Sequence, residues 1–266
     1  MRFLPVAVLL CLTQATPEVL GQSPEVFEVA SIKPADPSKP GTYFRFEPGA
    51  SVQIEGATLR ALILFAYDIR DFQLSGANGW MSSDRYSIRT KGTMAEGPAD
   101  FVQMNDGQRK VMAALIRKRM QALLAERFQL VFHRETREVP MYSLVVAKGG
   151  VKMTPNPSPD GSQQSMMMGN SKFSATRASL DSIAQSLASM VGRPVQNETG
   201  LPGYYDFKME WTPDAAPTAG VNEERLDTIG PTLVTALQEQ LGLRLAAKKG
   251  PVEIVVIDKA ERASEN

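Results

Sequence analysis

The residues of this chain that could carry out chemistry are few and stand apart from one another. His133 is the only histidine, and Arg134 and Glu135 follow it directly. A histidine in this setting could act as a general base, or it could be a polar residue on the open face of a strand. Because no partner motif would hold its ring in one tautomer, we favour the second interpretation.

Motifs for nucleophilic and metal-assisted catalysis are absent from the sequence. It contains no Gly-x-Ser-x-Gly, Ser-x-x-Lys or His-Glu-x-x-His motif and no glycine-rich phosphate loop. The single histidine cannot supply the three or four ligands of a zinc site. Two acidic pairs could serve glycoside hydrolysis, but their spacing is equally typical of turns and strand faces: Asp68 with Asp71, and Asp206 with Glu210. We therefore predict no catalytic, cofactor-binding or metal-binding residues, and a role other than catalysis.

Composition narrows the classes of partner. The chain has 266 residues, of which 43% are hydrophobic, so it can bury a sizeable core. Its 29 basic residues are balanced by 29 acidic ones. Nucleic acids and anionic membranes select basic surfaces, so neither is an expected partner. An unidentified protein or a small extracellular ligand fits better, and the oligomeric state is left open.

The beginning of the chain resembles a secretory signal peptide. Arg2 precedes an apolar run, residues 3–12, that is too short to span a bilayer, and small residues allow cleavage after Ala15 or Gly21. A buried helix at the start of the chain is the alternative, but Pro5 disfavours it. We expect an exported protein with residues 1–21 removed and no membrane span after cleavage. Since Cys11 is the only cysteine, the mature chain would contain no disulfide.

Hydrophobic periodicity predicts a mixed succession of strands and helices. A helix is expected to run from Leu59 to about Tyr67, with Thr58 as its N-cap. A longer helix is expected over residues 103–127, with one apolar and one basic side. Five strands are expected at Val26–Ile32, Tyr43–Glu47, Ser51–Glu55, Asp71–Ser75 and Arg85–Arg89.

The two sides of the long helix are expected to differ in charge. Its apolar side would contain Val111, Leu115, Met120 and Leu123 or Leu124. The other side would contain Arg109, Lys110 and the run Arg117-Lys118-Arg119. We interpret this basic side as a solvated helix face rather than as an anion site.

One pattern occurs twice in the chain. Residues 120–148 predict a helix end followed by two strands, and residues 235–259 repeat that pattern with a short basic turn between the strands. Leu130 and Leu243 fall at matching places. The unit helix-strand-strand-helix-strand-strand thus covers residues 51–148 and 172–259 and indicates a tandem duplication.

The duplication predicts an α+β fold of two lobes, each a mostly antiparallel sheet covered by helices. We place the first lobe, with its N-terminal strand, at residues 22–150 and the second at residues 172–266. A linker rich in proline, serine and methionine would join them over residues 151–171.

Four motifs in order resemble a known family. They are Phe27–Pro34, Glu126–Glu138, Thr199–Phe207 and Ala236–Leu243, and together they extend over essentially the whole mature chain. The sequence is similar to a soil-associated secreted family that is expanded in acidobacteria and has no known function. Related domains are also joined to membrane metallopeptidase sensors. The resemblance implies an extracytoplasmic binding or sensing role and carries over no catalytic residue.

Features present in only one of the two repeats suggest where a partner would bind. The candidate surface contains Trp80, His133, Arg134, Arg137, Tyr204 and Tyr205. Trp80 and Tyr204 should be partly exposed beside a cleft between the lobes, although aromatics of this kind also serve as core residues. We expect a secreted or periplasmic binding or interaction module, with sensing as one form of that role. The alternative is an extracytoplasmic hydrolase acting on cell-wall or extracellular polymer.

Overall fold

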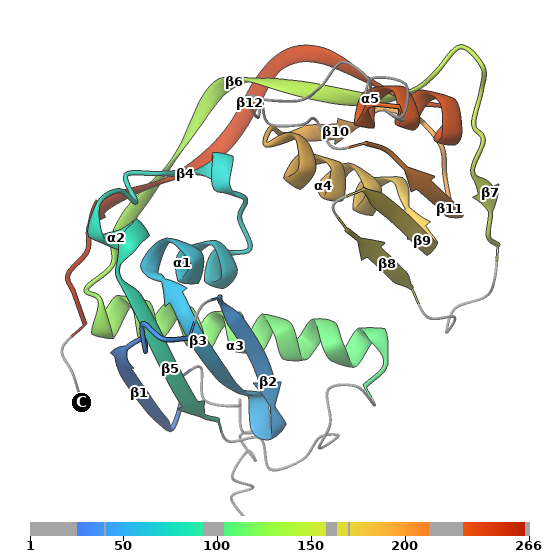
Figure 1. Ribbon diagram of the computed structural model, residues 1–266. Helices are drawn as coiled ribbons and strands as arrows, with labels where there is room; N and C mark the ends of the chain where they lie inside the picture. Colours follow the sequence, from blue (N-terminus) through green and yellow to red (C-terminus); the bar gives the residue numbers. More distant parts are fainter. Residues whose placement is uncertain are drawn as a thin grey trace, which may run out of the picture.

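The computed structural model describes residues 26–39, 41–92, 104–157, 164–169, 171–212 and 231–263. They form an α+β fold with three four-stranded sheets. Two of the sheets belong to separate lobes, and the third arches over both lobes (Figure 1). Two groups of buried apolar residues form the core of the first lobe and the core of the second. The two-lobed α+β architecture expected from the sequence is therefore present.

The first lobe is built on an entirely antiparallel sheet in the order β1-β5-β3-β2. Two helices pack against it: α1, Leu59–Tyr67, and α3, Asp106–Arg127. The expected hairpin about Pro48 and Gly49 is confirmed, with a short 3-10 turn η1 at Pro48–Ala50. The strands are β1 (Val29–Pro34), β2 (Tyr43–Glu47), β3 (Ser51–Thr58) and β5 (Arg85–Lys91).

The second lobe has the corresponding plan. Its sheet is also antiparallel, in the order β7-β11-β9-β8. Its helices are α4, Leu180–Val191, and α5, Leu233–Ala236, which continues directly into the π-helical turn η5, Leu237–Leu241. The strands are β7 (Thr154–Pro155), β8 (Ser165–Met168), β9 (Lys172–Ser179) and β11 (Tyr204–Glu210).

The third sheet joins the lobes. Its centre is an antiparallel pair of long strands, β6, Val131–Val146, and β12, Leu243–Lys259. A short strand of the first lobe, β4, Leu74–Ser75, pairs in parallel with β12, and a short strand of the second lobe, β10, Val195–Asn197, pairs in parallel with β6. Figure 1 shows the long pair arching over both lobes, with α1 and α4 on its concave side.

These long strands correct one prediction. The sequence predicts two strands after each repeated helix, but each pair of strands is one continuous strand. The basic turn expected before Val252 lies instead in the middle of the arch, opposite Pro140, where β6 and β12 pair with each other and not with β4 or β10. Each strand has an open edge there, which is where proline is tolerated in a sheet.

The polarity of α3 also differs from the prediction. Val111 is 70% exposed, whereas Met112, Ile116 and Met120 are buried. Arg119, assigned to the solvated face, is fully buried and donates to the carbonyl oxygen of Ala50 at 3.2 Å. Met120, Leu123 and Leu124 are buried as expected, whereas Met112 and Ile116 take the buried positions expected for Val111 and Leu115. Arg119 can be buried because its side chain donates to carbonyl oxygens of the turn at Pro48–Ala50.

The two halves repeat unusual backbone conformations at matching places. Left-handed residues follow α1 and α4, at Asp68 (φ 52°) and Gly192 (φ 63°). They also precede β6 and β12, at Gln129 (φ 49°) and Gly242 (φ 69°). Non-glycine residues seldom adopt this conformation, so its repetition fits a tandem duplication. The duplication itself stays a prediction.

Three shorter segments also differ from the predicted secondary structure. The connection that holds Trp80 contains a short helix, α2, Trp80–Ser83, and the strand expected at Asp71–Ser75 consists of the 3-10 turn η2, Asp71–Gln73, followed by β4. The expected linker contributes the edge strands β7 and β8. The expected signal peptide lies outside the described residues.

The structure buries the two matching leucines in different cores. Leu130 is 7% exposed in the first core and Leu243 is fully buried in the second. We predict that Leu130→Ala and Leu243→Ala each lower the free energy of unfolding by about 2–5 kcal/mol, as truncation of buried leucines does elsewhere. Urea unfolding followed by circular dichroism measures this.

Val131→Ala is the matched control, because Val131 is next to Leu130 but 52% exposed. Its expected cost is about 0.5 kcal/mol or less. Since β6 and β12 each enter both cores, both leucine variants should shift one common transition. Two separate transitions, each shifted by only one variant, would contradict this account of the arch.

Candidate functional site

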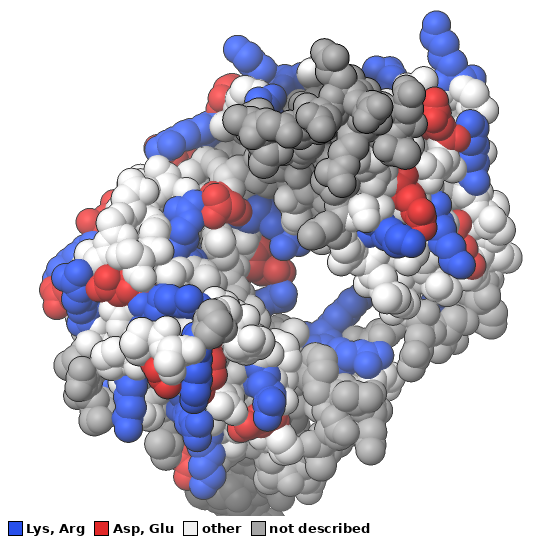
Figure 2. All heavy atoms as spheres, in the orientation of Figure 1, with Lys and Arg blue, Asp and Glu red and all other residues white. Residues whose placement is uncertain are grey.

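A cleft of about 770 Å³ lies between the two lobes. Figure 2 shows the molecule hollowed at this place, with basic and acidic groups interspersed over the visible surface. A smaller hollow of about 260 Å³ continues from it and shares four lining residues, Asp68, Arg70, Phe72 and Ala188. The cleft is lined by Leu64, Phe65, Asp68, Ile69, Arg70, Asp71, Phe72, Arg117, Ala188, Ser189 and Gly192.

Helix α1 supplies the apolar part of the first-lobe wall. Its N-terminus is fixed by Thr58, whose hydroxyl oxygen accepts from the N–H of Ala61 at 3.2 Å. One side of the helix is buried in the core, so Leu64 and Phe65 on another side remain half-buried at the cleft. The ring of Phe65 also lies 5.0 Å from that of Phe44 on β2. Packing against the sheet thus holds this wall in place.

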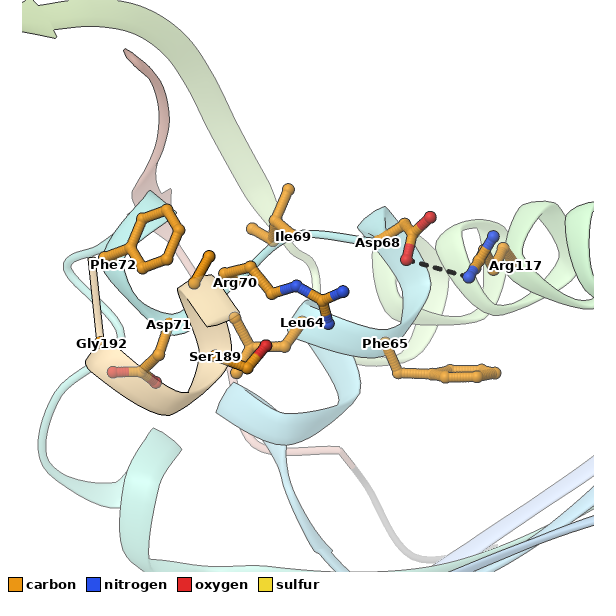
Figure 3. Close-up of a pocket in the computed structure, with 11 residues that line it drawn as sticks. Leu64, Phe65, Asp68, Ile69, Arg70, Asp71, Phe72, Arg117, Ser189 and Gly192 are labelled. Carbon is orange, nitrogen blue, oxygen red and sulfur yellow. Dashed lines mark hydrogen bonds and ion pairs between the residues drawn. The ribbon is translucent and has the colours of Figure 1, made fainter. Parts of the chain in front are cut away.

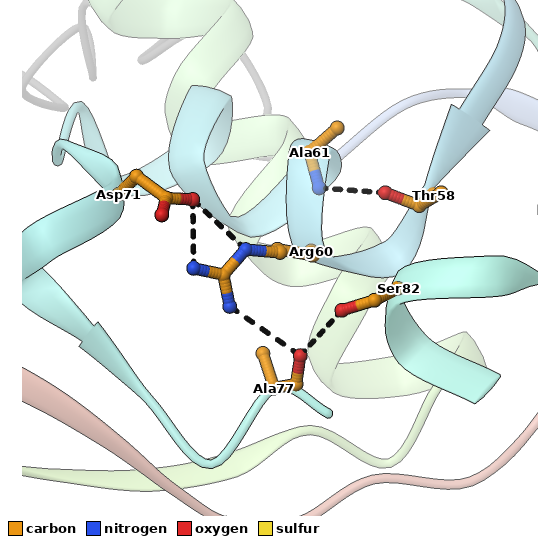
Figure 4. A network of polar contacts seen from close by, with 6 residues as sticks. All are labelled: Thr58, Arg60, Ala61, Asp71, Ala77 and Ser82. Atoms are coloured by element: carbon orange, nitrogen blue, oxygen red, sulfur yellow. Dashed lines mark hydrogen bonds and ion pairs between the residues drawn. The ribbon is translucent and has the colours of Figure 1, made fainter. Parts of the chain in front are cut away.

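A polar network fixes the segment that follows α1. The guanidinium group of Arg60 on α1 binds the carboxylate of Asp71 through two nitrogens, Nη2 at 2.7 Å and Nε at 2.9 Å (Figure 4). The carbonyl oxygen of Ala77 accepts from Ser82 Oγ at 2.7 Å and from Arg60 Nη1 at 3.4 Å. Both nitrogens contact the same carboxylate oxygen, Oδ1, and hydrogen bonds between charged groups are stronger than neutral ones. These contacts hold η2 against the helix and therefore determine where its neighbours Arg70 and Phe72 lie.

Arg70 is the charged group of the cleft whose side chain has no partner among the described residues. Its main chain is well anchored, since its N–H donates to Gln73 Oε1 at 3.1 Å and its carbonyl oxygen accepts from the N–H of Gln73 at 2.8 Å. Its guanidinium group makes no ion pair and no hydrogen bond with the described residues. The side chain is exposed, and Figure 3 shows it extending away from Phe72 across the space beside the end of α1.

Arg117 of α3 forms another part of the first-lobe wall. Its Nη2 lies 2.9 Å from Asp68 Oδ1, and this ion pair joins α3 to the end of α1 (Figure 3). Its Nε is buried and has no hydrogen-bond partner among the described residues. The negative charge of Asp68 is thus engaged by Arg117, whose own hydrogen-bonding capacity is not fully used.

The second-lobe wall is the last turn of α4. Ser179 caps the start of this helix by accepting from the N–H of Ser182 at 3.2 Å, and the helix ends at Gly192 in the left-handed conformation. The residues it presents to the cleft are small: Ala188, Ser189 and Gly192. The charged and aromatic groups of the cleft therefore come from the first lobe.

The candidate residues chosen from sequence do not form one surface. Trp80 is half-buried on α2, with Arg262 Cζ 5.1 Å from its ring. His133 is exposed on the arch, and its Nδ1 lies 2.8 Å from Asp258 Oδ1. Arg134 forms an ion pair with Glu253, and Arg137 forms one with Glu135. None of these four is among the described residues that line the cleft.

The tyrosine pair lies in the second lobe, on β11. Tyr204 is half-buried, with Arg177 Cζ 4.6 Å from its ring. Tyr205 is only 8% exposed, and its hydroxyl donates to the carbonyl oxygen of Pro202 at 3.1 Å. Alternation along the strand turns Tyr205 into the core, so this residue contributes packing rather than an exposed contact.

The acidic pairs considered for hydrolysis are engaged in structural contacts. Asp68 and Asp71 both line the cleft, but each is bound by an arginine. Asp206 accepts a hydrogen bond from the main-chain N–H of Arg177 at 2.7 Å, and this bond is the main reason that its pKa is lowered. A hydrogen bond from the Asn156 amide lowers that pKa further. A general acid needs a raised pKa, so Asp206 does not fit that role. No cluster of metal-ligating side chains occurs within the described residues.

A family comparison matches residues 60–260, and the chain belongs to that family, described as protein of unknown function (DUF3738). The match covers the first-lobe wall of the cleft, α4 and both strands of the arch. Comparisons with curated proteins and with solved structures give no significant match. The described part of the chain has no helix with the length and apolar character that crossing a bilayer requires.

The lowered pKa of Asp206 predicts a pH dependence. A carboxyl group whose pKa is lower in the folded state than in the unfolded state stabilises the protein above the unfolded value, and this stability is lost as pH falls through the folded value. Asp206→Asn should therefore reduce stability at pH 7, and the difference from wild type should shrink from about pH 4 downward, near the ordinary pKa of aspartate.

Urea midpoints measured between neutral and acidic pH test this difference. Glu210→Gln on the same strand is the control, because Glu210 is exposed and, among the described residues, its carboxylate contacts only Lys172. Exposed ion pairs contribute little, so this variant should resemble wild type. A difference between wild type and Asp206→Asn that does not change with pH would contradict the assigned role of the carboxylate.

Proposed function

We propose that this protein is an exported binding module that takes a small ligand in the cleft between its lobes. The carrying observation is Arg70, an exposed guanidinium group that lines the cleft beside half-buried aromatic residues and has no partner among the described residues. Ligand sites are mostly apolar clefts of about 300–1,000 Å³ with a few convergent polar groups. The cleft, at about 770 Å³, matches that description in volume, and its lining combines apolar side chains with charged ones.

The cleft also has the walls that a binding site requires. One wall is a helix packed on the first sheet, together with a turn held by Arg60 and Asp71. The other is the end of α4, which is packed in the second core. Sites on rigid elements lose less conformational entropy when a ligand binds. No observation on the described residues favours the hydrolase alternative, so we propose binding without turnover.

The export part of the proposal rests on the sequence pattern of residues 1–21 and on the resemblance to secreted soil proteins of acidobacteria. A sensing role would follow if ligand occupancy changed contacts with another protein, as the related sensor fusions suggest. The order of events would then be export, ligand capture in the cleft and recognition of the occupied form.

The neutral fluorescent probe N-phenyl-1-naphthylamine tests whether the cleft binds apolar molecules. We expect a fluorescence increase on binding, and Ser189→Trp should weaken binding by about tenfold or more, equivalent to about 1.4 kcal/mol. Ser189 is exposed on α4 and lines the cleft, so a bulky side chain there can occupy ligand space without entering the core.

Val111→Trp is the matched control, since it places the same side chain on an exposed site of α3 that does not line the cleft. Both variants should keep the wild-type melting temperature. Equal binding of the probe to wild type, Ser189→Trp and Val111→Trp would show that it binds elsewhere, and the cleft would lose its proposed role.

Export is tested by producing the full chain in a bacterium with a general secretion pathway and fractionating the cells. We expect the protein outside the cytoplasm, with a mature N-terminus at Thr16 or Gln22 as determined by mass spectrometry. Arg2→Glu combined with Leu9→Arg should abolish export, because it removes the basic region and interrupts the apolar run. An intact Met1 in a protein that stays in the cytoplasm would refute the export proposal.

A further inference from the structure

We infer, building on the proposed function of the cleft, that its ligand is an amphipathic organic anion. One carboxylate, phosphate or sulfonate group would bind the guanidinium group of Arg70, and an apolar or aromatic body would lie against the apolar lining, to which Leu64, Phe65 and Phe72 belong. The inference rests on the pairing of charges in the cleft, on the anchoring of Arg70 and on the character of the walls around it.

The charges of the cleft leave a single positive group unpaired. Both of its carboxylates are engaged, Asp68 by Arg117 at 2.9 Å and Asp71 by Arg60 at 2.7 Å. Arg70 is the guanidinium group that remains without a partner among the described residues lining the cleft. A ligand with one negative charge would compensate it. A cationic ligand would have to compete with an arginine for a carboxylate.

The position of Arg70 suits recognition of an anion. Its backbone is held by Gln73 on one side and by the Arg60–Asp71 contact on the other. A guanidinium group presents planar, paired donors that match carboxylate and phosphate oxygens. Because its main chain is fixed, Arg70 loses less freedom on binding than an arginine on a loose loop would.

The remaining surface of the cleft calls for an apolar body. Leu64, Phe65 and Phe72 are half-buried, and Ile69 is buried. A small inorganic anion would leave these side chains in contact with water. Covering apolar surface contributes about 25 cal/mol per Å², so a ligand that joins an anionic group to an apolar body uses both features.

The test compares an anionic probe with a neutral one of similar shape. 8-Anilinonaphthalene-1-sulfonate carries a sulfonate group, and N-phenyl-1-naphthylamine has the same aromatic framework without it. Arg70→Gln should weaken binding of the sulfonate probe by about tenfold or more, the usual size of a lost hydrogen bond to a charged group. It should leave binding of the neutral probe unchanged, because Gln keeps the polar surface and the aromatic walls.

Two further variants serve as controls. Arg70→Lys keeps the charge but not the planar fork, so it should retain part of the affinity for the sulfonate probe. Arg89→Gln removes an exposed arginine on β5 that does not line the cleft, and it should bind both probes as wild type does. Melting temperatures and circular dichroism spectra establish that each variant is folded.

The outcomes separate this inference from the proposed function. If Ser189→Trp weakens binding of the neutral probe but Arg70→Gln leaves binding of the sulfonate probe intact, the cleft binds ligands and the anion assignment is wrong. Equal losses in Arg70→Gln and Arg89→Gln would also overturn the assignment, since the effect would then reflect overall charge. If neither probe responds to Ser189→Trp, the proposed function itself fails.

Discussion

The backbone ladder between β6 and β12 is the interaction on which the arrangement of the two lobes depends. At one end, Phe132 and Ile257 pack against the first core, and at the other Leu144 and Leu243 are buried in the second. Each long strand therefore begins in one lobe and ends in the other, so the lobes cannot part without breaking ladder hydrogen bonds. The width of the cleft beneath the arch follows from this ladder. Its middle is a two-stranded ribbon, which is the least rigid form of sheet.

The sequence predicted those elements that are determined by interactions between neighbouring residues. Thr58 marks the start of α1 because its hydroxyl group caps the helix, and the Pro48-Gly49 pair marks the hairpin because of its backbone preference. The middle of the arch has no such local signal. Around Arg134–Glu138 the side chains are polar on both faces of the strand, so hydrophobic alternation disappears although the strand continues. Arg119 shows the converse, a charged residue in a buried position whose carbonyl partners lie 69 residues away or more.

The cleft was not predictable for a related reason. Its walls are α1 with η2 and the end of α4, segments more than 100 residues apart that the arch brings together. Within the first wall, Arg60 and Asp71 form a contact that local periodicity does not reveal.

Comparison of the two repeats could have pointed to Arg70 and Phe72. Arg70 and Phe72 have no charged and aromatic counterparts at the matching place of the second copy, where Pro194 precedes β10 and Val195 begins it. The same criterion selected Trp80 and Tyr204, which turn out to pack beside arginines away from the cleft.

The unequal walls of the cleft limit how a ligand can lie within it. The carboxyl end of a helix carries a partial negative charge, and α4 ends at the cleft, so an anionic group is disfavoured near Gly192. At the end of α1 the N–H of Asp68 already donates to the carbonyl oxygens of Leu64 and Phe65, and the N–H of Ile69 donates to that of Leu64. The charge on Arg70 therefore determines the local potential on the first-lobe side. The anionic group of a ligand would face the first lobe, and the small residues of α4 would contact its apolar body, so the two lobes would contact different parts of the ligand.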